Sequence, residues 1–166
     1  MKIAIMQPYF LPYIGYFQLI KSVDRYVIYD DVQFIKGGWI NRNNILLNGE
    51  KFMFNLFLDG ASANKLINEI AVNKNQSKFI KTIENAYRKA PYFESFYPFL
   101  LSLFEYEDSR LSKFIGNSII EMCKYLNIKT EIIYSSDLNK DIQLKGQDKV
   151  ISICKLLAAD TYINTI

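Results

Sequence analysis

Two adjacent carboxylates are the residues of this chain best suited to acid–base chemistry. Asp30 and Asp31 directly follow an apolar run. Such a pair could bind Mg²⁺ alongside substrate phosphates, hold sugar or ribose hydroxyls, or remove a proton as a general base. The alternative is a solvated strand end, because aspartate side chains also bond to nearby backbone amides. We therefore expect Asp30 and Asp31 to be catalytic, with Mg²⁺ as the one cofactor that they suggest.

A polar, glycine-broken stretch at residues 31–44 holds groups that recognise ligands. Arginine and lysine suit a phosphate or a carboxylate, amides suit sugar hydroxyls, and an indole can stack on a base or a sugar face. The candidate binding residues in this stretch are Lys36, Trp39, Asn41, Arg42 and Asn43. The alternative is a hydrogen-bonded loop in which Trp39, the only tryptophan, is a hydrophobic plug.

A proline-stiffened turn at residues 7–16 is the second candidate binding segment. A helix that begins after it would offer free backbone amides to a phosphate, and a glycine would let the ligand approach the backbone. The candidate binding residues here are Gln7, Pro8, Tyr13, Gly15 and Tyr16. The alternative is a stiff loop that only leads into a helix.

The residue types that are missing exclude several mechanisms. The chain has no histidine, which excludes Ser-His-Asp and Cys-His nucleophiles, histidine-containing zinc sites and an imidazole base. Its two cysteines, Cys123 and Cys154, lie in apolar runs and are expected to be small buried hydrophobes. Any chemistry must therefore use carboxylates, cations, tyrosines, amides or the backbone.

Length and composition indicate one globular domain over residues 1–166, and the order of its elements makes it an α/β domain. An aromatic content of 15% excludes a disordered chain, and a net charge of +3 is too small to indicate binding to nucleic acid. The apolar run at residues 3–6 is too short for a signal peptide or a membrane span. We therefore expect a cytoplasmic protein that has no membrane span and does not bind nucleic acid.

The elements that must position these residues begin with a βαβ unit. Residues 2–6 and 26–29 are predicted strands, and the spacing of apolar residues predicts a helix between about 13 and 22. Strands joined in this way are parallel and end at the same edge of the sheet, which is where ligands bind in open α/β sheets. Both candidate segments should therefore meet at one edge.

The later elements complete a three-layer fold. A hairpin is predicted around Asn48-Gly49, followed by helices within residues 79–90, 93–104 and 111–126, a strand at 130–134, a helix at 148–157 and a strand from 161. The expected fold is a mainly parallel, Rossmann-like sheet with an inserted hairpin and helical segment. The phenylalanines of residues 93–104 have the spacing of a core face or a homodimer face. The polar segment Lys145–Lys149 is expected to be either a solvated helix start or a phosphate contact.

Long motifs of this chain resemble the WbqC-like family of bacteria. They are MKIAIMQPYFLPYIGY at residues 1–16, VIYDDVQF at 27–34 and WINRN at 39–43, and a looser resemblance runs from Lys149 to Asn164. Members of that family are usually encoded among genes for O-antigen, capsule or other glycan precursors. The resemblance also implies a C-terminal segment beyond Thr165-Ile166, with a glycine pair, a strand and a hairpin.

The turn at residues 7–16 is also laid out like the nucleotide-binding turn of the nucleotidyltransferase-like group that includes pantothenate synthetase. That group carries a His-any-Gly-His motif, which would fall on Tyr13-Ile14-Gly15-Tyr16, so Gly15 matches and two tyrosines replace the histidines. Together the resemblances imply a transferase that acts on a nucleotide-linked sugar or related precursor of surface polysaccharide. The alternative is a non-catalytic nucleotide-binding or scaffold protein that recruits other glycan enzymes.

Overall fold

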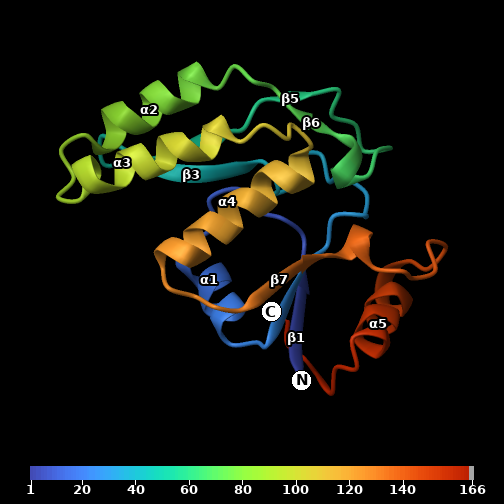
Figure 1. The fold of residues 1–166 in the computed structure, drawn as a ribbon. Helices are drawn as coiled ribbons and strands as arrows, with labels where there is room; N and C mark the ends of the chain where they lie inside the picture. Colours follow the sequence, from blue (N-terminus) through green and yellow to red (C-terminus); the bar gives the residue numbers. More distant parts are fainter. Residues whose placement is uncertain (165–166) are drawn as a thin grey trace.

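The computed structural model describes residues 1–164 (Figure 1), and the segment expected beyond Thr165-Ile166 lies outside them. Four parallel strands form its central sheet. They are β1 (Lys2–Met6), β2 (Arg25–Ile28), β7 (Glu131–Tyr134) and β8 (Thr161–Tyr162), in the order β7-β2-β1-β8. Such a sheet has two faces to cover, and the chain supplies apolar side chains to both.

Three helices cover the two faces of this sheet. Helices α1 (Ile14–Lys21) and α4 (Leu111–Tyr125) lie on one side and α5 (Gly146–Leu156) on the other (Figure 1). Ala4 of β1 packs into the larger core on the first side. Ile3 and Ile5 point the other way and pack with Ile153 of α5. The alternation along β1 therefore builds both cores.

A second body is inserted between β2 and α4. Its elements are the hairpin β3 (Arg42–Leu47) and β4 (Glu50–Asn55), the short pair β5 (Leu58–Asp59) and β6 (Ala71–Val72), and the helices α2 (Ser77–Tyr87) and α3 (Phe93–Ser102). Short 3₁₀ helices occupy Ile67–Glu69, Leu103–Glu105 and Ser135–Asp137. In the hairpin turn, Asn48 and Gly49 have φ of 53° and 82°, as a type I′ turn requires.

The ring of Phe10 joins the inserted body to the sheet. Phe10 follows β1 and is fully buried, and its amide donates to the carbonyl of Ile40 at 2.9 Å. The ring centroids of four aromatic neighbours lie 5.9 to 6.4 Å from its own. These neighbours come from β4, from α2, from the 3₁₀ helix at Leu103–Glu105 and from α4. These are Phe54, Phe79, Phe104 and Phe114. One side chain of the turn thus anchors four elements.

The three-layer α/β prediction is confirmed, including the parallel pairing of β1 with β2 and the inserted hairpin and helices. One boundary is wrong. Residues 42–44 were expected in a loop, whereas they begin β3 and pair with residues 53–55. Polar residues are tolerated there because the hairpin has a solvent-facing side. Within residues 1–164, no helix has the length and hydrophobicity needed to cross a membrane.

Replacing the anchor ring should destabilise the whole fold. We expect Phe10→Ala to lower the free energy of unfolding by about 3–5 kcal/mol, because it removes a fully buried ring from a packed cluster. Urea denaturation followed by circular dichroism measures the loss. The matched control is Phe57→Ala, since the Phe57 side chain is 43% exposed. A loss below about 1 kcal/mol in Phe10→Ala would contradict the anchoring role.

Candidate functional site

A cleft of about 550 Å³ opens at the carboxyl ends of the central strands. Its floor comes from the end of β1, and its walls come from α1, the loop after β2, α5 and the residues around β8. The lining residues are Ile5, Met6, Gln7, Pro8, Tyr9, Tyr13, Tyr16, Leu19, Tyr29, Ile35, Gly38, Trp39, Ile40, Val150, Tyr162 and Asn164. This is the sheet edge at which α/β proteins bind ligands, and the volume is that of a small-molecule site.

Five of the predicted binding residues line this cleft. They are Gln7, Pro8, Tyr13, Tyr16 and Trp39, and they come from two segments about 25 residues apart in the chain. The rings of Tyr13 and Trp39 are 59% and 50% exposed. Exposed rings at the wall of a cleft offer flat apolar surfaces on which a base or a sugar can stack.

Gly15 lies behind the cleft wall. A Cβ atom on Gly15 would come within 2.3 Å of Cε2 of Tyr13, so any larger residue would displace the Tyr13 ring. The absence of a side chain at this position therefore shapes the first turn of α1. The residue supports the cleft and does not line it.

The remaining predicted binding residues lie outside the lining. The amides of Asn41 and Asn43 donate to backbone carbonyls, at 3.1 Å to Leu56 and at 2.6 Å to Leu11. Arg42 places its guanidinium carbon 5.1 Å from the centroid of the Trp39 ring, a cation–π contact that holds the indole from outside the cleft. Lys36 is exposed on the same loop. The Asn43 amide thus ties the hairpin to the turn, and the Asn41 amide joins the two ends of the hairpin.

The hydroxyls of Tyr16 and Tyr29, two of the cleft tyrosines, are held in their neutral form. Burial raises the pKa of Tyr16 well above its ordinary value, and its hydroxyl donates to the carbonyl of Gln7 at 3.0 Å. Burial, with a smaller effect from the charge of Asp31, raises the pKa of Tyr29 to about 12. The Tyr29 hydroxyl is buried and has no hydrogen-bond partner within residues 1–164. These groups can donate hydrogen bonds and are poor bases near pH 7.

Asp30 and Asp31 lie at the neighbouring end of β2 and do not line the cleft. Asp30 is fully buried, and its two oxygens accept from the amide of Ser136 at 2.9 Å and from its hydroxyl at 2.8 Å. This contact ties the end of β2 to the residues that follow β7. The Asp30 side chain therefore caps backbone and hydroxyl groups, and its oxygens are not open as those of a catalytic carboxylate would be.

Asp31 is the centre of a buried ion-pair network. Its carboxylate accepts from the hydroxyl of Ser135 at 2.7 Å and pairs with the ammonium groups of Lys140 at 2.8 Å and Lys149 at 3.0 Å. Lys149 also donates to the Asp31 carbonyl at 2.7 Å, and Lys140 to that of Ser135. The side chains of the two lysines are only 3% and 7% exposed. The network therefore fixes α5, which carries Lys149, against the end of β2.

The same contacts lower the pKa of Asp31. Burial alone would raise it, but the hydrogen bonds from Lys140, Ser135 and Lys149 together outweigh burial and favour the carboxylate. Two lysines in the place of a divalent cation do not fit a magnesium site. No group of three or more potential metal-ligating side chains occurs within residues 1–164. We therefore derive no metal step from this pair.

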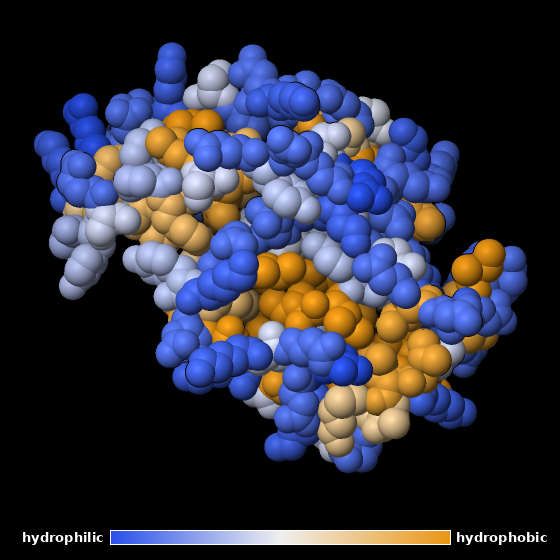
Figure 2. All heavy atoms as spheres, viewed as in Figure 1, coloured by the Kyte–Doolittle hydropathy of each residue, from blue (hydrophilic) through white to orange (hydrophobic). Residues whose placement is uncertain are grey.

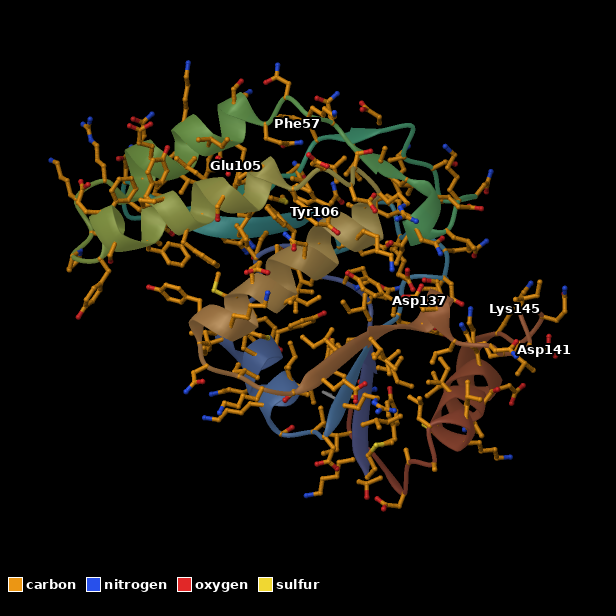
Figure 3. All side chains as sticks on the ribbon, in the orientation of Figure 1. Phe57, Glu105, Tyr106, Asp137, Asp141 and Lys145 are labelled. Carbon is orange, nitrogen blue, oxygen red and sulfur yellow. The ribbon has the colours of Figure 1, made fainter. Side chains whose placement is uncertain are left out.

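The two lysines that bound the segment at residues 145–149 differ in burial. Lys149 faces inward and binds Asp31, so its cation is already paired, whereas Lys145 is exposed. Figure 3 shows Lys145 and Asp141 at the outer end of the segment that leads into α5, away from the sheet, with Asp137 closer to β7. Asp137 pairs there with Lys113 of α4 at 3.2 Å.

Sequence reasoning missed several residues that the structure brings to this edge. Tyr29 and Tyr162 line the cleft, and Tyr29 could have been found because it stands at the end of a predicted strand. Lys140 carried no local signal, since it lies in an irregular segment and meets Asp31 only through the fold. Its role depends on contacts between residues 109 positions apart.

Removing the Asp31 charge should reveal how strongly the network holds the fold. We expect Asp31→Asn to cost about 3–5 kcal/mol of unfolding free energy at pH 7, because two buried ammonium groups lose their partner. The folded pKa of Asp31 is lowered, so this stability is present above about pH 4 and is lost as the pH falls through the folded pKa. Urea denaturation from pH 7 to pH 2 should therefore show the two proteins converging in acid.

The control for this experiment is Asp148→Asn, an exposed carboxylate next to Lys149. It should stay within about 0.5–1 kcal/mol of the parent, as for a charge near the start of a helix. A constant difference between Asp31→Asn and the parent at every pH would contradict the network.

Comparison with known proteins identifies the family of this chain. The model of the WbqC-like protein family matches residues 7–166. The protein called "Uncharacterized protein Rv1507c", from Mycobacterium tuberculosis (strain ATCC 25618 / H37Rv), is 27% identical over 167 residues, which cover 98% of this chain and 71% of that protein. No solved structure matches the chain. Since the family match includes the turn, the aspartate pair and the tryptophan loop, this chain belongs to the WbqC-like protein family.

Proposed function

We propose that this protein binds a nucleotide or a nucleotide-linked sugar in the cleft at the end of β1, and that it transfers a group in the assembly of bacterial surface polysaccharide. The observation that carries the proposal is the cleft itself. It lies at the carboxyl edge of a parallel sheet, beside the first turn of α1, with exposed aromatic rings at its wall. The resemblance to the WbqC-like family implies the pathway.

The chemistry of the lining suits a sugar or a base better than a bare phosphate. Trp39 and Tyr13 offer stacking faces, and the amides of Gln7 and Asn164 can bond to hydroxyls. Among the lining residues within 1–164, none is a lysine, an arginine or a carboxylate. The phosphates would therefore lie toward the loop, within reach of Lys36 and of the Arg42 guanidinium beside Trp39.

The transfer step needs a base, and Asp30 and Asp31 are the proposed source. Neither carboxylate lines the cleft, but both follow Tyr29, which does, so a substrate reaches them only when their contacts with Ser136 or with the two lysines open. A specific observation favours the non-catalytic alternative. Both carboxylates are engaged by serines or lysines, and Tyr16 and Tyr29 are held neutral. Binding and turnover must therefore be measured separately.

Binding is tested by a thermal-shift screen of ATP, CTP, UDP-sugars and dTDP-sugars, each with and without Mg²⁺. A ligand at about 100 times its Kd adds about 2.7 kcal/mol of stability. We expect one donor class to raise the Tm, and Trp39→Ala to weaken its binding by about 5- to 150-fold through the lost stacking. Phe57→Ala removes another half-exposed ring, remote from the lining, and should bind as the parent does. Equal binding by Trp39→Ala and the parent would reject this site.

Turnover is tested with the donor found in that screen and a set of monosaccharide acceptors whose hydroxyls take the transferred group, with water as the acceptor in their absence. We expect the parent protein to release the nucleotide product and Asp30→Asn to lower kcat by about 10²- to 10⁴-fold with an unchanged Kd, as for the loss of a general base. Asp148→Asn is the control carboxylate and should keep the parental rate. Tight donor binding with no product release by the parent would instead establish the non-catalytic alternative.

A further inference from the structure

A second cleft lies on the opposite side of the turn at residues 7–13. It has a volume of about 390 Å³ and is walled by the turn, the hairpin, α2, α3 and α4. Its lining is almost entirely apolar. The lining residues are Leu11, Pro12, Phe17, Asn43, Asn44, Ile45, Phe54, Ile83, Tyr87, Ala90, Pro91, Tyr92, Phe93, Phe96, Tyr97, Leu100 and Met122. In the part of the chain that the structure describes, it shares no lining residue with the cleft at the sheet edge.

Hydrogen bonds and ring stacking made by the lining residues themselves hold the walls of this apolar cleft. The Tyr87 hydroxyl accepts the amide proton of Leu46, which ties α2 to the hairpin, and the Asn43 amide donates to the carbonyl of Leu11. In α3, the rings of Phe93 and Tyr97 stack with centroids 4.5 Å apart. These contacts hold three walls at fixed positions, so the cleft is preformed.

The cleft is also open to solvent. Figure 2 shows hydrophobic atoms reaching the surface below α3, between it and α4. Ala90 and Pro91 at its rim are exposed, while Phe54 and Leu100 at its base are buried. Water in such a space finds few polar partners, so an apolar ligand that displaces it gains free energy.

We propose that this apolar cleft binds the hydrocarbon chain of an amphiphile, such as an acyl chain. A concave space of this volume with walls from five elements is typical of a small-molecule site, whereas a protein partner usually covers about 800 Å² of flatter surface. The rim charges are mixed, with Arg88 and Lys89 before Ala90 and with Glu84 and Glu94 on the flanking helices. The apolar chain therefore supplies the affinity, and the head group stays in solvent.

The proposal is tested by calorimetric titration with dodecanoate, dodecan-1-ol, octanoate and butanoate, each below its micellar concentration. We expect dodecanoate to bind more tightly than octanoate, on the order of tenfold for every two added methylenes until the cleft is full, and butanoate not to bind. Binding of dodecan-1-ol together with dodecanoate would identify the chain as the recognised part. Absence of binding by both long-chain probes would overturn the proposal.

Two variants assign the binding to this cleft. Ala90→Trp fills the mouth from an exposed position, and Met122→Asp puts a charge on the α4 wall; each should weaken dodecanoate binding by at least about tenfold. Ala61→Trp makes the same change at an exposed alanine outside the lining and should bind as the parent does. Circular dichroism confirms that each variant is folded. Unchanged binding in both cleft variants would place the probe elsewhere and reject the site.

Discussion

The burial of one phenylalanine ring determines how the two bodies of this protein fit together. Phe10 belongs to the turn that leaves the central strand, yet its ring packs among aromatic rings of the hairpin and the helices. Because the ring is fully buried, the turn cannot move without opening that core. The path of residues 7–13 is therefore set by packing on one side and by the sheet on the other.

That turn is also the partition between the two clefts. Its residues face two ways: Tyr9 and Tyr13 line the cleft at the sheet edge, while Leu11 and Pro12 line the apolar cleft. Leu11 adopts a φ of 47°, which is uncommon for a residue with a side chain, and its carbonyl is held by the Asn43 amide. The conformation that divides the clefts is thus stabilised by a contact from the inserted hairpin.

At the end of β2, ion pairs rather than apolar packing hold the elements together. A buried carboxylate is costly unless it is paired and hydrogen-bonded, and Asp31 satisfies both conditions through Lys140 and Lys149. Lys149 stands next to Val150, which lines the cleft at the sheet edge. The ion-pair network therefore positions one wall of the proposed binding site, and the lining itself stays aromatic and uncharged. With this uncharged lining, stacking and hydrogen bonds would hold the ligand.

Much of the fold follows from local sequence patterns. Apolar alternation in residues 2–6, the βαβ spacing and the Asn48-Gly49 turn each specify their element through short-range sterics and periodicity, so the layers and the parallel sheet were predictable. The turn at residues 7–16 and Trp39 were likewise identifiable as cleft residues, because strand ends collect ligand sites. The limits of this reasoning appear at the charged residues. Asp31 reads as a metal ligand or a base in isolation, and only the fold brings Lys140 and Lys149 to it, since the free energy of a buried charge depends on neighbours that are distant in the chain.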